Sequence, residues 1–297
     1  MTEPDFLDLL RGLPLHPGAL DLTDDAARLG DFIVTTDTLV EGTHFLATDS
    51  PGDVAWKLLA VNMSDLAAKG ATPAAVLLNY PLSSDTWDRA FIAGFGDALR
   101  AFGCSLLGGD TVSGGARVFT VTAFGRAPAQ PSVRSGAKAG DALWVTGTIG
   151  DAGAGLAIAR GADGPPELLA AYRRPQPLLV EGRALGPFVH AMMDVSDGLL
   201  LDASRMASAS GLAVEIDLDR VPLSAALRIF AGEDRGARLA AATAGDDYAL
   251  LFAAAADFLP PVAATRVGRL REGSGLTLFD ADGAVPSPST LGFLHGR

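Results

Sequence analysis

The sequence predicts a mixed α/β (α+β) fold arranged as two α/β domains, and three observations support this. Short β-rich runs alternate with longer segments of helical periodicity along the chain. A stretch rich in Pro, Ser and Gly, residues 127–139, interrupts the alternation near the middle. The 297 residues are 48% hydrophobic and 20% charged, which suits two packed domains and argues against extensive disorder. We expect an N-terminal domain over residues 1–137 and a C-terminal domain over residues 138–297.

The first half is expected to contain two long helices between short strands. Residues 53–69 carry apolar side chains around so wide a stripe that this helix is predicted to be mostly buried. Its two lysines, Lys57 and Lys69, are expected to be solvated or to lie at a helix end. Residues 85–102 place aromatic side chains on one face, as an amphipathic helix does. The predicted strands are residues 31–36, 74–80, 105–107 and 118–124.

The second half repeats the alternation of strands and helices with shorter elements. Gly211 is expected to end one of its helices, and Ser224 to begin another. The predicted helices are residues 152–160, 177–191 and 199–210, and residues 161–166 form a break. The predicted strands are residues 142–146, 192–195, 214–218 and 248–253, with 265–270 and 276–279 as further candidates.

Charge and composition exclude several classes of protein. The chain has 23 basic and 35 acidic residues, a formal net charge of -12, which argues against nucleic-acid partners and against a basic membrane-surface protein. The longest uncharged stretch, residues 70–84, contains two prolines and is too short to span a bilayer. Residues 1–10 do not resemble a signal peptide, so we expect a cytoplasmic location. The single cysteine, Cys104, excludes an intrachain disulfide and is expected to be a small buried side chain.

Aspartates beside apolar runs are the distinctive feature of this sequence. A single aspartate of this kind is explained as a helix cap or a turn residue, and Asp53 and Asp85 are expected to be plain caps. The recurrence of the pattern is harder to explain in this way, because several of these aspartates follow strand-like runs. In α/β folds the carboxyl ends of strands line the ligand crevice. The set comprises Asp24, Asp25, Asp37, Asp65, Asp110, Asp194, Asp197, Asp246 and Asp247.

If these carboxylates converge, they require a counter-charge. Two like charges ~4 Å apart repel by about 4 kcal/mol at an effective dielectric constant near 20. Oxygen ligands without a set of His and Cys favour Mg²⁺ or Mn²⁺ over zinc, and Mg²⁺ is often shared with substrate phosphates. Thr36, Ser64 and Ser196 could supply further oxygens. The sequence therefore predicts a phosphate-handling site built from acidic side chains and metal.

Other phosphate-binding devices are missing from the sequence. It contains no P-loop motif and no protein kinase signature set. The glycine-rich residues 147–155 do not fit the dinucleotide-binding pattern and are explained as a tight strand-to-helix turn. No Ser/His/Asp or Cys/His arrangement stands out, so no catalytic nucleophile or general base is predicted.

Seven motifs, in this order, resemble the thiamine-monophosphate kinase family of the aminoimidazole-ribonucleotide-synthetase-like superfamily. The resemblance covers nearly the whole chain, and residues 35–45 with 62–65 are its most specific part. Two positions depart from the family pattern: Thr23 replaces a Gly before the Asp pair, and Asp246 replaces a Glu. The motifs are DDAA (24–27), TTDTLVEGTHF (35–45), WKLLAVNMSDLAAKG (56–70), LGGDT (107–111), RSGAKAGD (134–141), DVSDGL (194–199) and GDDYAL (245–250).

The resemblance implies a fold, an activity and a set of residue roles. It implies two α/β domains in a homodimer paired through N-terminal strands, and ATP-dependent phosphorylation of thiamine monophosphate to thiamine diphosphate with several Mg²⁺ ions. The implied metal ligands are Asp25, Thr35, Thr36, Asp37, Asp65, Asp110, Asp194 and Asp197. The implied ATP contacts are Gly109, Asp110, Arg134 and Ser196, and the implied thiamine contacts are His44, Asp246 and Phe293.

The chemistry of such a reaction agrees with the missing nucleophile. A phosphate monoester has a second pKa near 6, so the acceptor is already largely deprotonated at pH 7 and needs no general base. Mg²⁺ held by the aspartates would neutralise both anions and align an in-line transfer, and Arg134 could clamp phosphate. We expect no covalent phospho-enzyme.

Two alternatives remain open at this stage. One is another ATP-dependent synthetase of the superfamily, although this chain lacks the reactive N-terminal Cys of selenophosphate synthetases and the C-terminal Cys of the hydrogenase-maturation relative. The other is a non-catalytic protein that binds thiamine phosphate or nucleotide. Release of ADP in the presence of thiamine monophosphate distinguishes an enzyme from this binding protein.

Overall fold

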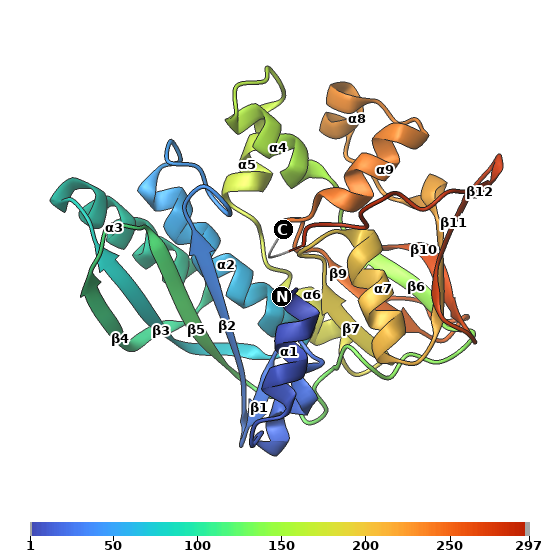
Figure 1. The fold of residues 1–297 in the computed structure, drawn as a ribbon, viewed down its shortest axis with the longest axis horizontal. Helices are drawn as coiled ribbons and strands as arrows, with labels where there is room; N and C mark the ends of the chain where they lie inside the picture. Colours follow the sequence, from blue (N-terminus) through green and yellow to red (C-terminus); the bar gives the residue numbers. More distant parts are fainter. Residues whose placement is uncertain (1, 295–297) are drawn as a thin grey trace.

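The chain folds around two β-sheets with one long helix between them (Figure 1). The computed structural model describes residues 2–294. The first sheet has the strand order β1-β2-β5-β3-β4 and is antiparallel except for the parallel pair β3 and β4. Its strands are β1 (Ala27–Leu29), β2 (Phe32–Val40), β3 (Thr72–Leu82), β4 (Ser105–Ser113) and β5 (Val118–Arg126).

The second sheet has the strand order β12-β11-β8-β10-β6-β9-β7 and is also mostly antiparallel. The segment 127–141 that joins the two sheets contains no helix or strand. The two sheets and the helices packed on them confirm the predicted mixed α/β class. The strands are β6 (Ala142–Thr146), β7 (Ala191–Asp194), β8 (Ala213–Asp217), β9 (Leu250–Ala254), β10 (Ala264–Arg271), β11 (Gly275–Asp280) and β12 (Gly283–Val285).

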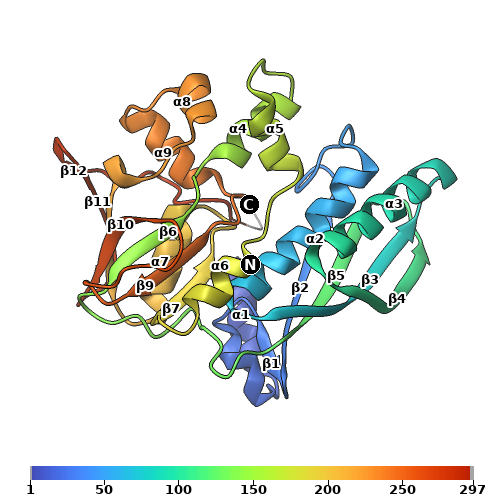
Figure 2. The same cartoon turned by 180° about the vertical axis from the view of Figure 1, so that it is seen from behind.

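Helix α2 (Pro51–Ala68) is the element that both sheets share, and it runs between them in both views (Figures 1 and 2). Its first turns pack on β2, β5 and α3 (Asp85–Phe102), whereas Ala67 and Ala68 join a core cluster with β7, β9 and α6 (Leu179–Leu185). The approach of α6 is so close that a Cβ added at Gly182 would lie 2.0 Å from the carbonyl oxygen of Ala67. The expectation of a mostly buried helix is confirmed.

The remaining helices surround this frame. Helix α7 packs on the second sheet, and α4 packs against α5. No helix in the described part of the chain has the length and apolar character needed to cross a membrane. The helices are α1 (Glu3–Arg11), η1 (Pro17–Leu22), α4 (Asp151–Ala159), α5 (Pro166–Arg173), α7 (Leu199–Ala209), η2 (Leu218–Arg220), α8 (Ala225–Ala231) and α9 (Arg235–Ala244).

Three expectations about local structure are wrong. The helix predicted over residues 177–191 is limited to α6, because Pro187, just after the C-cap Gly186, has no backbone N–H to continue the helix. Helix α5 was not anticipated. Three of the aspartates expected beside apolar runs lie within an element instead: Asp37 within β2, Asp65 within α2 and Asp110 within β4.

Cys104 is buried in the first core, as expected. Burial raises the pKa of its thiol to about 11, so the thiol stays protonated at neutral pH. This state suits a packing residue and does not suit a nucleophile.

Candidate functional site

Three aspartates from three elements, Asp37, Asp65 and Asp194, interact electrostatically beside helix α2, and we call them the central aspartates. Asp37 projects from β2, Asp65 belongs to α2, and Asp194 ends β7. Burial raises the pKa of Asp65 well above its usual range, and the negative charges of Asp37 and Asp194 raise it further. Burial, followed by the charge of Asp25, raises the pKa of Asp194 to about 8.

Neutral groups hold the central aspartates in place. The Thr35 hydroxyl donates to Asp65, the Ser64 hydroxyl donates to Asp194 at 2.6 Å, and the Asn62 side-chain oxygen accepts from the backbone N–H of Asp37 at 3.1 Å. Within residues 2–294, no basic side chain forms an ion pair with Asp65 or Asp194. Asp65 and Asp194 therefore have hydroxyl partners but no positive counter-charge within the described part of the chain.

A hard divalent cation fits this environment. The donors are carboxylate and hydroxyl oxygens, which are the ligand types that Mg²⁺ prefers, and burial together with neighbouring carboxylates raises the pKa values of Asp65 and Asp194. In the part of the chain that the structure describes, no three Asp, Glu, His or Cys side chains already converge on one point. The described residues thus provide oxygen ligands of the type that Mg²⁺ prefers, but these oxygens do not yet surround a single point as a full set of ligands.

A second acidic group, Asp24 and Asp25, is neutralised by the protein itself. The ammonium group of Lys69, a residue that is only 2% exposed, lies 2.9 Å from Asp25 and also pairs with Asp24. The guanidinium of Arg134 pairs with Asp25 as well. Burial alone would raise the pKa of Asp25, but Lys69 and Arg134 outweigh it and lower the pKa to about 2. Of the two expectations for Lys69, the position at a helix end is confirmed, because Lys69 caps the C-terminus of α2, and the solvated side chain is wrong.

The loop after β7 is held from both sides. Asp202, which is fully buried, accepts hydrogen bonds from the backbone N–H groups of Ser196 at 3.0 Å and Asp197 at 3.1 Å. Arg205 bridges the carboxylates of Asp197 and Asp202. The backbone N–H of Phe293 donates to the carbonyl of Asp197 at 2.9 Å, which brings the C-terminal segment to this loop. These contacts fix the position of Ser196 and Asp197.

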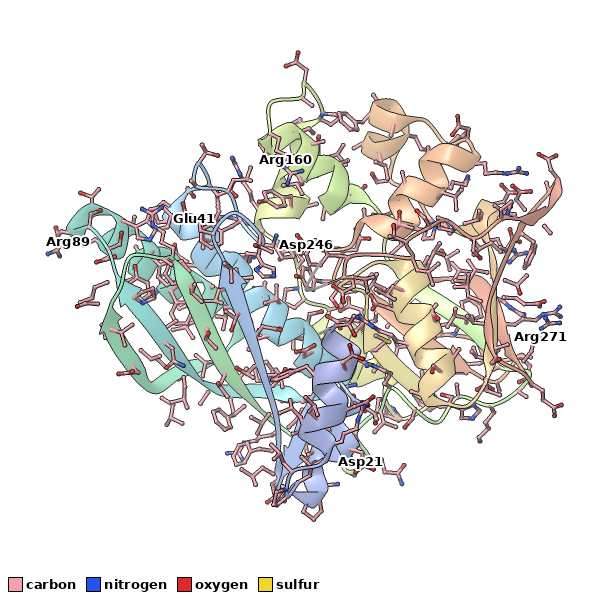
Figure 3. All side chains as sticks on the ribbon, viewed as in Figure 1. Asp21, Glu41, Arg89, Arg160, Asp246 and Arg271 are labelled. Carbon is pink, nitrogen blue, oxygen red and sulfur yellow. The ribbon has the colours of Figure 1, made fainter. Side chains whose placement is uncertain are left out.

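Lys57 joins the two sequence-predicted thiamine contacts His44 and Asp246, which come from different halves of the chain. Its ammonium group lies 2.6 Å from a carboxylate oxygen of Asp246 and 3.0 Å from the carbonyl oxygen of His44, over the ring of Tyr172. Lys57 is 2% exposed, so the expectation of a solvated lysine is wrong here too. Asp246 lies near the middle of the molecule, between the two sheets (Figure 3).

A cavity of about 220 Å³ opens beside Asp246. Asp246 and Tyr248 both adopt left-handed backbone conformations, with φ of 65° and 53°, and the Tyr248 hydroxyl donates to Asp246 at 2.9 Å. Non-glycine residues in this region are strained, and such strain concentrates at functional sites. The lining residues are Gly147, Thr148, Asp151, Ala152, Ala171, Arg174, Pro175, Gln176, Leu178, Asp246, Asp247, Tyr248 and Ala249.

The structure does not bring every predicted site residue to the central aspartates. The Thr36 side chain points to the opposite face of β2 from Asp37, and its hydroxyl donates to the β5 backbone at 3.1 Å. Gly109 lies three hydrogen-bonded strands away from Asp37 in the same register, which corresponds to about 14 Å. Asp110 is exposed on β4 at the edge of the sheet.

Four residues of the site were missed from the sequence: Lys57, Lys69, Asp202 and Arg205. A signal for the two lysines was present, because a charged side chain within a helix expected to be mostly buried must find an opposite charge. No comparable signal marks Asp202 and Arg205, whose roles depend on the loop that α7 supports.

Comparisons with known proteins extend these observations. The chain matches the family described as AIR synthase related protein, with its N-terminal domain over residues 23–127 and its C-terminal domain over residues 138–281. It is 40% identical to thiamine-monophosphate kinase of Caulobacter vibrioides, over 99% of this chain and 91% of the relative. A solved structure described as AaThiL complexed with AMPPCP and TMP has a TM-score of 0.89 and 29% identity, covering 99% of this chain and 97% of the other. A crystal structure of thiamine-monophosphate kinase from Stenotrophomonas maltophilia K279a has a TM-score of 0.77 and 37% identity, covering 92% and 94%.

The raised pKa of Asp194 generates a prediction about stability in metal-free buffer. Between the unfolded value of 3.8 and the folded value of about 8, the folded protein keeps a proton that the unfolded chain releases. The free energy of unfolding should therefore fall as pH rises through this window. Asp194→Asn should remove up to about 1.4 kcal/mol per pH unit of that slope, because the amide does not titrate.

Urea unfolding in EDTA at several pH values from about 4 to about 8 measures this slope. The exposed Asp163→Asn is the matched control and should leave the slope unchanged. Equal slopes for wild type and Asp194→Asn would contradict the proposed protonation of Asp194.

Proposed function

The chain belongs to the thiamine-monophosphate kinase family of AIR synthase related proteins, and we propose that it phosphorylates thiamine monophosphate with ATP by direct in-line transfer. The product is thiamine diphosphate. The observation that carries this proposal is that α2 supplies both Lys57, which contacts Asp246 beside the cavity, and Asp65, one of the central aspartates. The relative with bound AMPPCP and TMP supports both substrates.

The spacing along α2 suits such a substrate. Lys57, which contacts Asp246, precedes Asp65 by eight residues, and this separation is about 12 Å along a helix. An extended molecule can therefore place its rings in the cavity and its phosphate beside the central aspartates. We propose that Asp246 accepts from the amino group of the pyrimidine ring while Lys57 keeps the carboxylate oriented. His44 and Phe293 complete the thiamine contacts in this proposal.

The chain's own residues orient the reactants and form no covalent intermediate. Mg²⁺ held by the central aspartates supplies the positive charge that lets two polyanions approach and that stabilises the transferring phosphoryl group. Thr35 and Ser64 fix the carboxylates that hold it. Asp202 and Arg205 fix the loop that presents Ser196 to ATP. The acceptor phosphate is already deprotonated, so no side chain is needed as a base.

Edge strand β4 supports a homodimer paired through the N-terminal strands. All nine of its residues are exposed, and Leu106, Leu107 and Val112 place apolar side chains in water. An exposed strand edge of this kind is a template for pairing with another chain. We propose that pairing through β4 covers this edge and brings Gly109 and Asp110 to the nucleotide of the other subunit, since one chain alone keeps them about 14 Å from Asp37.

An assay of the purified chain with ATP and thiamine monophosphate, with and without Mg²⁺, tests the proposed activity. Thiamine diphosphate and ADP should form together and only with the metal. Asp37→Asn should lower turnover by at least about 100-fold, because it removes charge that holds the metal at the transition state. Asp31→Asn, an exposed aspartate before the same strand, is the control. Binding of thiamine monophosphate without ADP release would favour a binding protein.

The role of Asp246 is tested by separating the KM values of the two substrates. Asp246→Asn should raise the KM for thiamine monophosphate by about 10- to 100-fold, the loss expected for one charge-assisted hydrogen bond. The KM for ATP should stay unchanged. Asp246→Glu should remain active, because it keeps the carboxylate. An equal rise in both KM values would remove Asp246 from the thiamine site.

The dimer is tested by Leu107→Lys, which places a charge on the exposed edge strand. The variant should be monomeric by light scattering and should lose at least about tenfold in turnover, because an unpaired charge at an apolar contact opposes association. Ile229→Lys, at a residue that is 80% exposed on α8, should behave as wild type. A monomeric wild type with full activity would contradict the proposed pairing.

A further inference from the structure

The ammonium group of Lys69 lies in an all-oxygen environment. It contacts a carboxylate oxygen of Asp24, a carboxylate oxygen of Asp25 at 2.9 Å and the backbone carbonyl of Met192 at 3.4 Å. The Lys69 side chain is 3% exposed, and those of Asp24 and Asp25 are 4% and 9% exposed. Two carboxylates and a carbonyl are also the ligand types of a hard divalent cation. Lys69 thus takes the place of a cation among these oxygens.

The other oxygens of this pair are occupied as well. The second carboxylate oxygen of Asp25 pairs with the Arg134 guanidinium, and that of Asp24 accepts from the Arg134 backbone N–H at 2.9 Å. The oxygen of Asp24 that contacts Lys69 also accepts from the backbone N–H of Asp25 at 2.8 Å. A divalent ion could bind here only by displacing Lys69 or Arg134, which would leave a buried positive charge without its partner.

The two acidic groups therefore differ in what neutralises them. Asp65 and Asp194 accept hydrogen bonds from hydroxyl groups, which carry no charge. The positive charges of Lys69 and Arg134 balance the negative charges of Asp24 and Asp25, so these four side chains together are neutral.

We infer that Lys69 is a built-in replacement for one divalent cation, so that metal binds at the central aspartates and is excluded from Asp24 and Asp25. The inference rests on the proposed function only in taking the central aspartates as the metal site. In this inference the basic side chains Lys69 and Arg134 neutralise Asp25, so Asp25 is not a metal ligand, whereas the family resemblance implies that it is one. Because the lysine is covalently attached, its charge is present at every metal concentration.

Lys69→Met tests this inference in the full chain. Methionine is unbranched and of similar length, so it fills the same space without the charge. The variant in EDTA should melt at least about 6 °C below wild type, because a buried ion pair has lost one partner. With Mn²⁺ as the probe, counted by the loss of the free-ion signal in electron paramagnetic resonance, the variant should bind one more ion per chain than wild type. Adding Mg²⁺ should raise the Tm of the Lys69→Met variant by more than it raises the Tm of wild type.

Two further variants make the result specific. Lys57→Met changes the other buried lysine of the same helix, whose partner is Asp246, and should lower the Tm without adding a Mn²⁺ ion. Asp25→Asn in the wild-type background removes the carboxylate that the family resemblance assigns to metal, keeps Lys69 paired with Asp24 and should leave the Mn²⁺ count unchanged. This second measurement decides the question even if Lys69→Met does not fold.

An unchanged Mn²⁺ count in folded Lys69→Met, or the loss of one ion in Asp25→Asn, would overturn the inference. Failure of the proposed function gives a different pattern. A wild type that binds Mn²⁺ but forms no thiamine diphosphate would overturn the activity, while the difference of one ion between wild type and Lys69→Met would still support the role of Lys69.

Discussion

Helix α2 is mostly buried although it carries Lys57 and Asp65 and is capped by Lys69, and this burial is the constraint on which the rest of the molecule depends. A buried charge without a partner costs several kcal/mol, so each of these side chains must meet a matching group. Those groups come from both sheets and from the loops around them. The contacts that pack the two halves together are therefore also the contacts that assemble the candidate site. Helix α2 contributes to both the core and the candidate site.

The charges along α2 divide the site into three zones. Lys57 and Asp246 form a neutral pair beside the cavity, Asp65 and Asp194 have hydroxyl partners without a basic one, and Lys69 neutralises the group around Asp25. The first zone suits recognition of an organic ring, and the second suits a metal-bound phosphate. The third provides structural support, since its oxygens are already satisfied. One helix thereby sets the spacing between recognition and chemistry.

Much of this arrangement was foreseeable from the sequence, and each error has an identifiable structural cause. The buried helix over residues 53–69 followed from its periodicity, and the motif order identified the family. The helix over 177–191 failed at Gly186 and Pro187, where backbone geometry overrides apolar pattern. The strand predicted over residues 31–36 ended before Asp37, whereas β2 continues to Val40 through pairing with β5, and such pairing is non-local.

The amino-acid sequence alone determined the fold class, the family, and the set of acidic and hydroxyl side chains available for phosphate chemistry, because these follow from periodicity and motif order. Only the tertiary structure decided which aspartates pair with a basic side chain and which accept only from hydroxyl groups. That outcome depends on contacts between distant segments, such as Lys69 with Asp25, 44 residues apart, and Ser64 with Asp194, 130 residues apart. Electrostatic partnership is a matter of distance and burial in space, and neither is encoded in the spacing of residues along the chain.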